Sequence, residues 1–182
     1  MGSGDICRAF YCGNVFIYTV MIQQGSQLWQ YLKPEMRQLA EDGRLLIEDR
    51  KLHPDVQLSD YSYLVFPFSK LYEGFLKYLF RDLGIIEERD YRSAHFRIGK
   101  VLSPNLAQRL GGRSAWRQIE KQFGAELADR LWHTWKEGRN LLFHFFPHNY
   151  RALREDAAHT LITLLVETME EAVKITNIKL TN

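Results

Sequence analysis

The 182-residue sequence predicts an all-α fold, a bundle of four main helices with several short ones, on three observations. Apolar residues recur at intervals of three and four along several segments, which is the period of an amphipathic helix. The chain has only 5 prolines, so long helices are permitted. Apolar residues make up 46% and charged residues 25%, values typical of a globular protein with one core, which excludes a disordered chain.

The pattern divides the chain into an N-terminal region, residues 1–58, and a helical domain, residues 59–182. The sequence assigns the N-terminal region no role. Near its start, β-branched and aromatic residues are dense over residues 15–22, which favours a short strand or an extension there.

The first helix is expected after Ser26, whose side chain can cap it, and should run over Gln27–Ala40. Pro34 lies inside this pattern and should split it into a turn and a helix. Gly43 should end it.

The strongest apolar periodicity begins at Asp60 and should end at Gly84, with a kink or a delayed start at Pro67. Further helices are expected downstream, the last of them long and without internal Gly or Pro. They cover residues 96–101, 106–110, 116–123, 125–135 and 150–177.

Charge is nearly balanced over the whole chain, at +2, but it is unevenly distributed. Residues 89–113 contain six Lys or Arg and one Asp, a local net charge of +5. Such a stretch is either a solvated basic face or a surface for an anionic partner. The two cysteines, Cys7 and Cys12, form no disulfide framework, and no apolar run is long enough to span a bilayer. We therefore expect a cytoplasmic protein without a membrane partner.

Three polar residues stand in the aromatic run 138–146: Arg139, Asn140 and His144. On an ideal helix, Asn140 and His144 share a face, and Arg139 lies about 140° from His144. Spacing alone permits a structural interpretation, in which the Arg extends from the core to solvent and the His bonds to a backbone carbonyl.

The pattern Arg139-Asn140-x-x-x-His144 resembles the signature of the HEPN superfamily, in which an Arg and a polar residue precede a His. The run from Tyr63 to Lys77 also resembles the early HEPN helix, in particular that of the ribonuclease LS toxins (RnlA/LsoA type), whose HEPN domain also binds the antitoxin. The resemblance covers about residues 60–175. It implies a HEPN-like bundle and matches Glu73 to the accessory acidic residue of the family, although Glu73 could also pair with a neighbouring Lys on its own helix.

The resemblance implies a metal-independent endoribonuclease, a toxin or phage-defence effector that needs no cofactor. The RNA 2′-hydroxyl would be the nucleophile, His144 the proton-transfer group and Arg139 the phosphate clamp, with Asn140 and Glu73 as supporting residues. A homodimer would bring two such motifs together, with a protein antitoxin or inhibitor as a further partner. The residues expected to contact RNA phosphates are Arg92, Arg97, Lys100, Lys136, Arg151 and Arg154.

One residue departs from the family pattern. Toxins that are controlled by a nucleotidyltransferase usually have Tyr two residues after the His, and here that position is Phe146. Control by adenylylation of that Tyr is therefore not expected.

Two other interpretations remain open. The chain could be a non-catalytic HEPN-like module for dimerisation or partner binding. A metal-binding helical bundle is disfavoured, because the sequence contains no Glu-x-x-His pair and Pro147 disturbs the four-residue spacing of His144 and His148.

Overall fold

In a computed structural model of the protein, residues 9–12, 15–18, 21–143 and 152–178 are described. The described chain is a helical bundle preceded by a small β-hairpin. Strands β1 (Ala9–Cys12) and β2 (Val15–Tyr18) pair antiparallel, with Ala9 opposite Tyr18. Apart from this hairpin, the regular structure of the described residues is helical, so the expected all-α class is confirmed for them.

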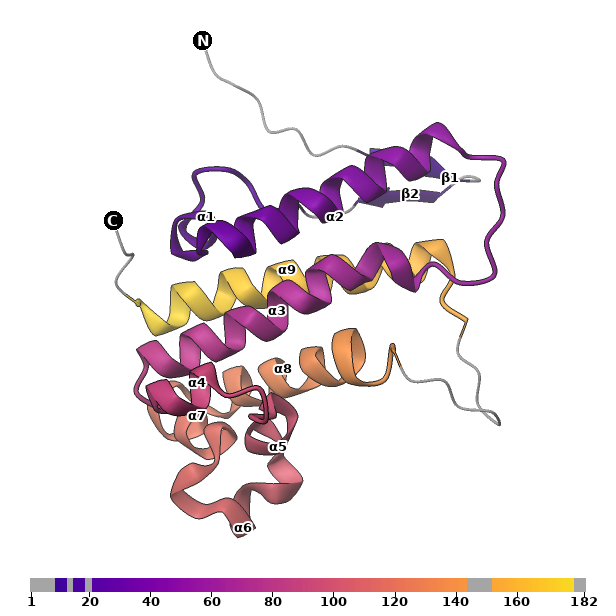
Figure 1. The fold of residues 1–182 in the computed structure, drawn as a ribbon. Helices are drawn as coiled ribbons and strands as arrows, with labels where there is room; N and C mark the ends of the chain where they lie inside the picture. Colours follow the sequence, from indigo (N-terminus) through magenta and orange to yellow (C-terminus); the bar gives the residue numbers. More distant parts are fainter. Residues whose placement is uncertain (1–8, 13–14, 19–20, 144–151, 179–182) are drawn as a thin grey trace.

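The bundle is organised around α3 (Ser62–Asp82), which contacts α2 (Pro34–Leu52) and α9 (Glu155–Thr176) (Figure 1). Twelve of the 21 residues of α3 are buried, far more than one stripe, so this helix is enclosed on several sides. The shorter α1 (Gln27–Tyr31) packs on α9, and α8 (Ala125–Trp135) packs on α9 below α3 in the view of Figure 1. None of the helices in the described ranges is long and apolar enough to cross a lipid bilayer.

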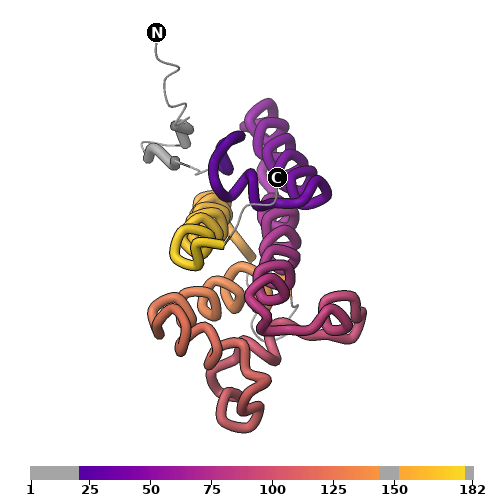
Figure 2. The backbone as a smooth tube through the Cα atoms, turned by 90° about the vertical axis from the view of Figure 1, so that its left-hand side faces the viewer, coloured from indigo at the N-terminus to yellow at the C-terminus, as the bar shows by residue number. Residues whose placement is uncertain are grey.

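Short elements connect α3 to α8, and most of them form the end of the molecule that lies lowest in Figures 1 and 2. The first of them packs on α3, and the others pack on one another and on α8. In chain order they are α4 (Glu88–Arg92), α5 (Ile98–Leu102), a 3-10 turn (Pro104–Leu106), α6 (Ala107–Leu110), a second 3-10 turn (Gly111–Arg113) and α7 (Ala115–Phe123).

The split of the first helical segment agrees with the sequence prediction. The hydroxyl of Ser26 accepts a hydrogen bond from the amide of Trp29 (3.1 Å) at the start of α1. Pro34 is the first residue of α2, where its missing N–H is not needed by the helix. The predicted end at Gly43 is wrong, because α2 continues to Leu52. A Cβ on Gly43 would lie 2.4 Å from the ring of Phe68, so this glycine permits close packing of α2 on α3 rather than ending the helix.

Helix α3 begins at Ser62, so Pro67 does not delay its start. The proline removes one backbone donor in the second turn, and its buried ring packs in the core. The end of the helix agrees with the prediction: Gly84 has φ +69°, and the amide of Ile85 bonds back to the carbonyl of Phe80 (2.8 Å).

Helix α9 begins at Glu155, whereas periodicity placed its start near residue 150. The difference arises at Leu153, whose backbone bonds to the start of α3 instead of joining a helix. Its carbonyl accepts from the amide of Tyr61 (2.9 Å), and its amide donates to the Asp60 carboxylate (3.3 Å).

Helices on both sides of residue 58 share one core, to which α1 and α2 contribute Leu28, Tyr31 and Ile47. A partly buried ion pair also joins them. The guanidinium of Arg50 on α2, only 8% exposed, donates to the carboxylate of Glu155 at the start of α9 (2.9 Å). The N-terminal region is therefore integrated into the bundle from α1 onward.

Candidate functional site

The candidate site lies where α8 ends and passes into a single π-helical turn, Lys136–Asn140. The amide of Leu141 donates to the carbonyl of Lys136 (3.0 Å), a bond spanning five residues rather than four. Turns of this kind are frequently found at functional sites. Residues 141–143 also form a turn, so a regular α-helix does not continue from Arg139 to residue 143. The predicted spacing of Arg139 and His144 lies partly outside the described residues.

Tertiary contacts hold the π-turn in place. Gly138 is buried at its centre, and a Cβ there would lie 2.8 Å from Cδ2 of Leu165 on α9. The carbonyl of Gly138 accepts a hydrogen bond from the buried hydroxyl of Ser69 on α3. Just before the turn, the hydroxyls of Thr134 and Thr168 bond to each other (3.0 Å) and tie α8 to α9. The turn therefore takes its shape from both neighbouring helices.

This turn presents Arg139 to α3. Its Nε donates to Oε2 of Glu73 at 3.0 Å, and the two side chains are 38% and 32% exposed. Lys70 and Lys77, the alternative partners of Glu73 on its own helix, make no ion pair within the described chain. At this exposure the pair adds at most about 1 kcal/mol to stability, so its main effect is on orientation.

The pairing through Nε leaves the far end of the guanidinium available. Neither terminal amino group of Arg139 has a hydrogen-bond partner among the residues that the structure describes. The ring of Phe143 lies beside the same guanidinium, with 5.9 Å between its centroid and Cζ, and packs edge-to-face on Phe66 (5.6 Å). A half-exposed guanidinium fixed on one side in this way can bind an anion with its two free amino groups.

The structure thus brings together Arg139 and Glu73, and Asn140 is the residue that follows Arg139 in the chain. Asn140 is the last residue of the π-turn and is half-buried. The predicted catalytic His144 and the predicted RNA contact Arg151 lie outside the described residues, as do Phe146, Pro147 and His148.

The predicted phosphate-binding cations differ in their surroundings. Lys136, Arg97 and Lys100 are exposed and make no ion pair with a described residue, although Arg97 also donates to the carbonyl of Ala94 (2.7 Å). Arg154 is exposed but pairs with Asp156.

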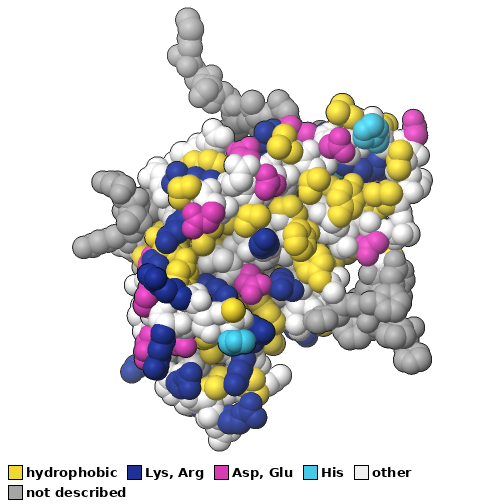
Figure 3. Space-filling view, viewed as in Figure 1, with side chains coloured by type: hydrophobic (Ala, Val, Ile, Leu, Met, Phe, Trp, Pro, Cys, Tyr) yellow, Lys and Arg dark blue, Asp and Glu magenta, His cyan; other side chains and the backbone are white. Residues whose placement is uncertain are grey.

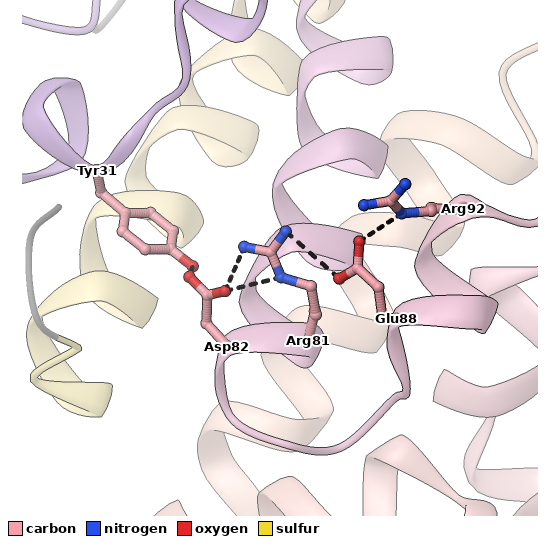
Figure 4. Close-up of polar contacts among 5 residues, drawn as sticks. All are labelled: Tyr31, Arg81, Asp82, Glu88 and Arg92. Atoms are coloured by element: carbon pink, nitrogen blue, oxygen red, sulfur yellow. Dashed lines mark hydrogen bonds and ion pairs between the residues drawn. The ribbon is translucent and has the colours of Figure 1, made fainter.

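Arg92 is engaged in a polar chain that links α1, α3 and α4 (Figure 4). Its guanidinium donates to Glu88 (2.6 Å), and Glu88 also lies 4.0 Å from Arg81. Arg81 in turn pairs with Asp82 (2.6 Å), which accepts a hydrogen bond from the Tyr31 hydroxyl (3.1 Å). Burial, followed by the neighbouring carboxylate, raises the pKa of Tyr31. This arrangement gives Arg92 a structural partner and makes it a weaker candidate for RNA contact.

The sequence did not point to the residues that shape the turn, namely Ser69, Leu165 and Phe66. Ser69 offered one signal, because it is a polar residue four positions before Glu73 within a strongly apolar helix. Leu165 and Phe66 offered none, since their contacts with residues 138 and 143 join distant parts of the chain.

Comparisons of the chain with models of protein families, with curated proteins and with solved structures found no match.

Proposed function

We propose that this protein is a metal-independent endoribonuclease of the HEPN class, with a HEPN-like arrangement of its bundle. The observation that carries the proposal is the Arg139–Glu73 pair, because it joins two residues that the family resemblance had selected 66 positions apart. The remaining support is the resemblance of the motif Arg139-Asn140-x-x-x-His144.

The proposed reaction uses the substrate as its own nucleophile. The RNA 2′-oxygen attacks the adjacent phosphorus, the bond from phosphorus to the 5′-oxygen breaks, and a 2′,3′-cyclic phosphate and a 5′-hydroxyl result. One proton leaves the 2′-hydroxyl and one reaches the 5′-oxygen, and His144 serves in this transfer. The free amino groups of Arg139 bind the phosphate oxygens, where negative charge grows during the attack. Glu73 orients Arg139, and Asn140 either orients His144 or bonds a phosphate oxygen.

The proposal extends to partners. A homodimer would place two copies of the motif in one cleft, supplying a second His144. A toxin or phage-defence role with a protein antitoxin or inhibitor follows from the same resemblance. Sedimentation as a monomer at micromolar concentration, unchanged by RNA, would contradict the dimer.

The test is cleavage of single-stranded RNA in the presence of EDTA, with the product ends identified. Arg139→Ala and His144→Ala should each reduce the rate by about a hundredfold or more. Glu73→Ala should cost less, because it removes only the orienting partner.

Arg130→Ala is a matched control. Arg130 lies on α8, is 37% exposed and forms an ion pair with Glu171 (2.7 Å), so it matches Arg139 in exposure and in having a carboxylate partner. It should retain full activity. Equal cleavage by wild type and His144→Ala, or no cleavage by wild type at any salt concentration, would defeat the proposal.

A scaffold function is the second candidate, supported by the exposed apolar side chains near the end of α2 and in the connector to α3. Leu52, Val56 and Leu58 are between 43% and 76% exposed. Exposed apolar side chains mark a protein-binding surface where they form one contiguous patch. The scaffold function becomes the better explanation if wild type does not cleave RNA or if none of the substitutions changes the rate of cleavage.

A further inference from the structure

Basic residues are concentrated in the lobe formed by α5, α6 and α7. Residues 93–124 contain six Lys or Arg and a single acidic residue, Glu120, for a net charge of +5. Since the whole chain carries +2, the rest of the molecule carries −3. We call this part of the molecule the basic lobe. Its six cations are Arg97, Lys100, Arg109, Arg113, Arg117 and Lys121.

All six cations of the basic lobe are exposed, and none of them forms an ion pair with a described residue. The neighbouring cations of α4 differ, because Arg89 pairs with Glu87 (2.8 Å) and Arg92 with Glu88 (2.6 Å). Figure 3 shows dark blue side chains gathered over the lower part of the molecule, where Figure 1 places α4 to α6. The charge of the basic lobe is therefore open to an external anion.

Helix geometry directs part of the basic lobe away from the core. On α7, the buried residues are Ala115 and Ile119, and Arg117 and Lys121 lie one turn apart on the opposite face. Helices α5, α6 and α7 contact one another, so these cations belong to one compact lobe.

The surface lacks the apolar centre that a protein interface usually has. The large exposed hydrophobic side chains of the described chain all lie elsewhere, and they are Leu45, Leu52, Val56, Leu58, Phe66 and Ile175. Protein interfaces bury an apolar, often aromatic core, whereas sequence-independent binding of nucleic acid rests on Lys and Arg contacts to phosphates. The composition of the basic lobe fits a polyanionic backbone.

We infer that the basic lobe binds the phosphate backbone of single-stranded RNA and holds the strand that the Arg139 site cuts. That the ligand is RNA rests on the proposed function. The positive charge and the exposure of the surface are independent of that function. The inference retains Arg97 and Lys100 from the sequence prediction, adds four cations and excludes Arg92.

Salt dependence measures the number of phosphates that the protein neutralises. For single strands, log K falls by about 0.7 per phosphate for each unit of log salt concentration. With about five phosphates engaged, a fourfold rise in salt weakens binding by about a hundredfold. Removal of three cations should reduce that loss to about sevenfold.

The experiment is fluorescence anisotropy with labelled 2′-O-methyl RNA, which has no free 2′-hydroxyl and cannot be cut by the proposed reaction. The test variant is Arg109→Gln/Arg113→Gln/Arg117→Gln. The control, Arg44→Gln/Arg89→Gln/Arg92→Gln, removes the same charge from surface arginines, one half-exposed and two exposed, that already have carboxylate partners. We expect the test variant to lose affinity and salt dependence, and the control to stay close to wild type.

Three results would overturn the inference. Equal losses in both triple variants would show that only net charge matters. Unchanged binding by the test variant would place the RNA elsewhere. Competition by a poly-glutamate peptide as strong as that by RNA would assign the surface to an acidic protein.

The outcomes for the two proposals are separable. If wild type binds 2′-O-methyl RNA through the basic lobe but cuts no RNA, the cleavage proposal is refuted and the inference of RNA binding by the basic lobe is upheld. If the test variant binds and cuts long RNA as wild type does, the inference of RNA binding by the basic lobe is refuted and the cleavage proposal is upheld.

Discussion

Replacement of Gly138 by alanine tests whether the π-turn depends on close contact with α9. The new Cβ would lie 2.8 Å from Cδ2 and 3.1 Å from Cγ of Leu165, and both atoms are in the core. Overpacking of a core typically costs about 1–3 kcal/mol. Alanine recovers about 0.5–1 kcal/mol of backbone entropy relative to glycine. We expect a net loss of about 1–2 kcal/mol, which lowers Tm by about 2–8 °C for a chain of this size.

Gly74→Ala is the matched control for this prediction. Gly74 lies in the interior of α3, and its added Cβ would meet only Cε of Met36, at an ordinary contact distance of 3.4 Å. This variant should gain up to about 1 kcal/mol, because only the entropy and propensity gains remain. Both variants are measured by thermal and urea unfolding. An increase in Tm for Gly138→Ala equal to that for Gly74→Ala would refute the reasoning.

Two further predictions concern the start of α9. Arg50→Ala leaves the Glu155 carboxylate without its guanidinium partner and should cost about 2–4 kcal/mol in urea unfolding; a loss below 1 kcal/mol would contradict it. Burial lowers the pKa of His159, with Lys51 and Arg50 adding to this effect and Glu155 and Asp156 opposing it. The folded state therefore binds fewer protons, so stability should fall as pH drops below about 6.5, and His159→Gln should flatten that fall in urea titrations at about pH 7.5 and 5.5.

Local sequence signals were sufficient wherever one residue type decides the conformation. Ser26, Pro34 and Gly84 each act through their own backbone or side chain, so the boundaries that they mark agree with the structure. The prediction at Gly43 was wrong because a glycine can either end a helix or allow the side chain of another helix to pack closely against the backbone. Which of the two applies depends on Phe68, 25 residues away.

The candidate site was predictable in composition but not in geometry. A resemblance selected Arg139 and Glu73, and the two side chains lie together. Their contact depends on a π-turn, which exists because Ser69 and Leu165 approach Gly138 from two other helices. Periodicity within residues 138–146 contains no information about those helices, so it predicted a regular helix instead.

The stretch between the π-turn and α9 is attached to one helix at both ends. Ser69 bonds to Gly138 at one end, and Tyr61 bonds to Leu153 at the other. Tyr61, directly before α3, and Ser69 within it are eight positions apart, or about 12 Å along the helix. Because a rigid helix sets this span, the chain between the anchors can change in length while its two ends keep their positions. New substrate or partner contacts could therefore evolve there by insertion, with little effect on the stability of the bundle.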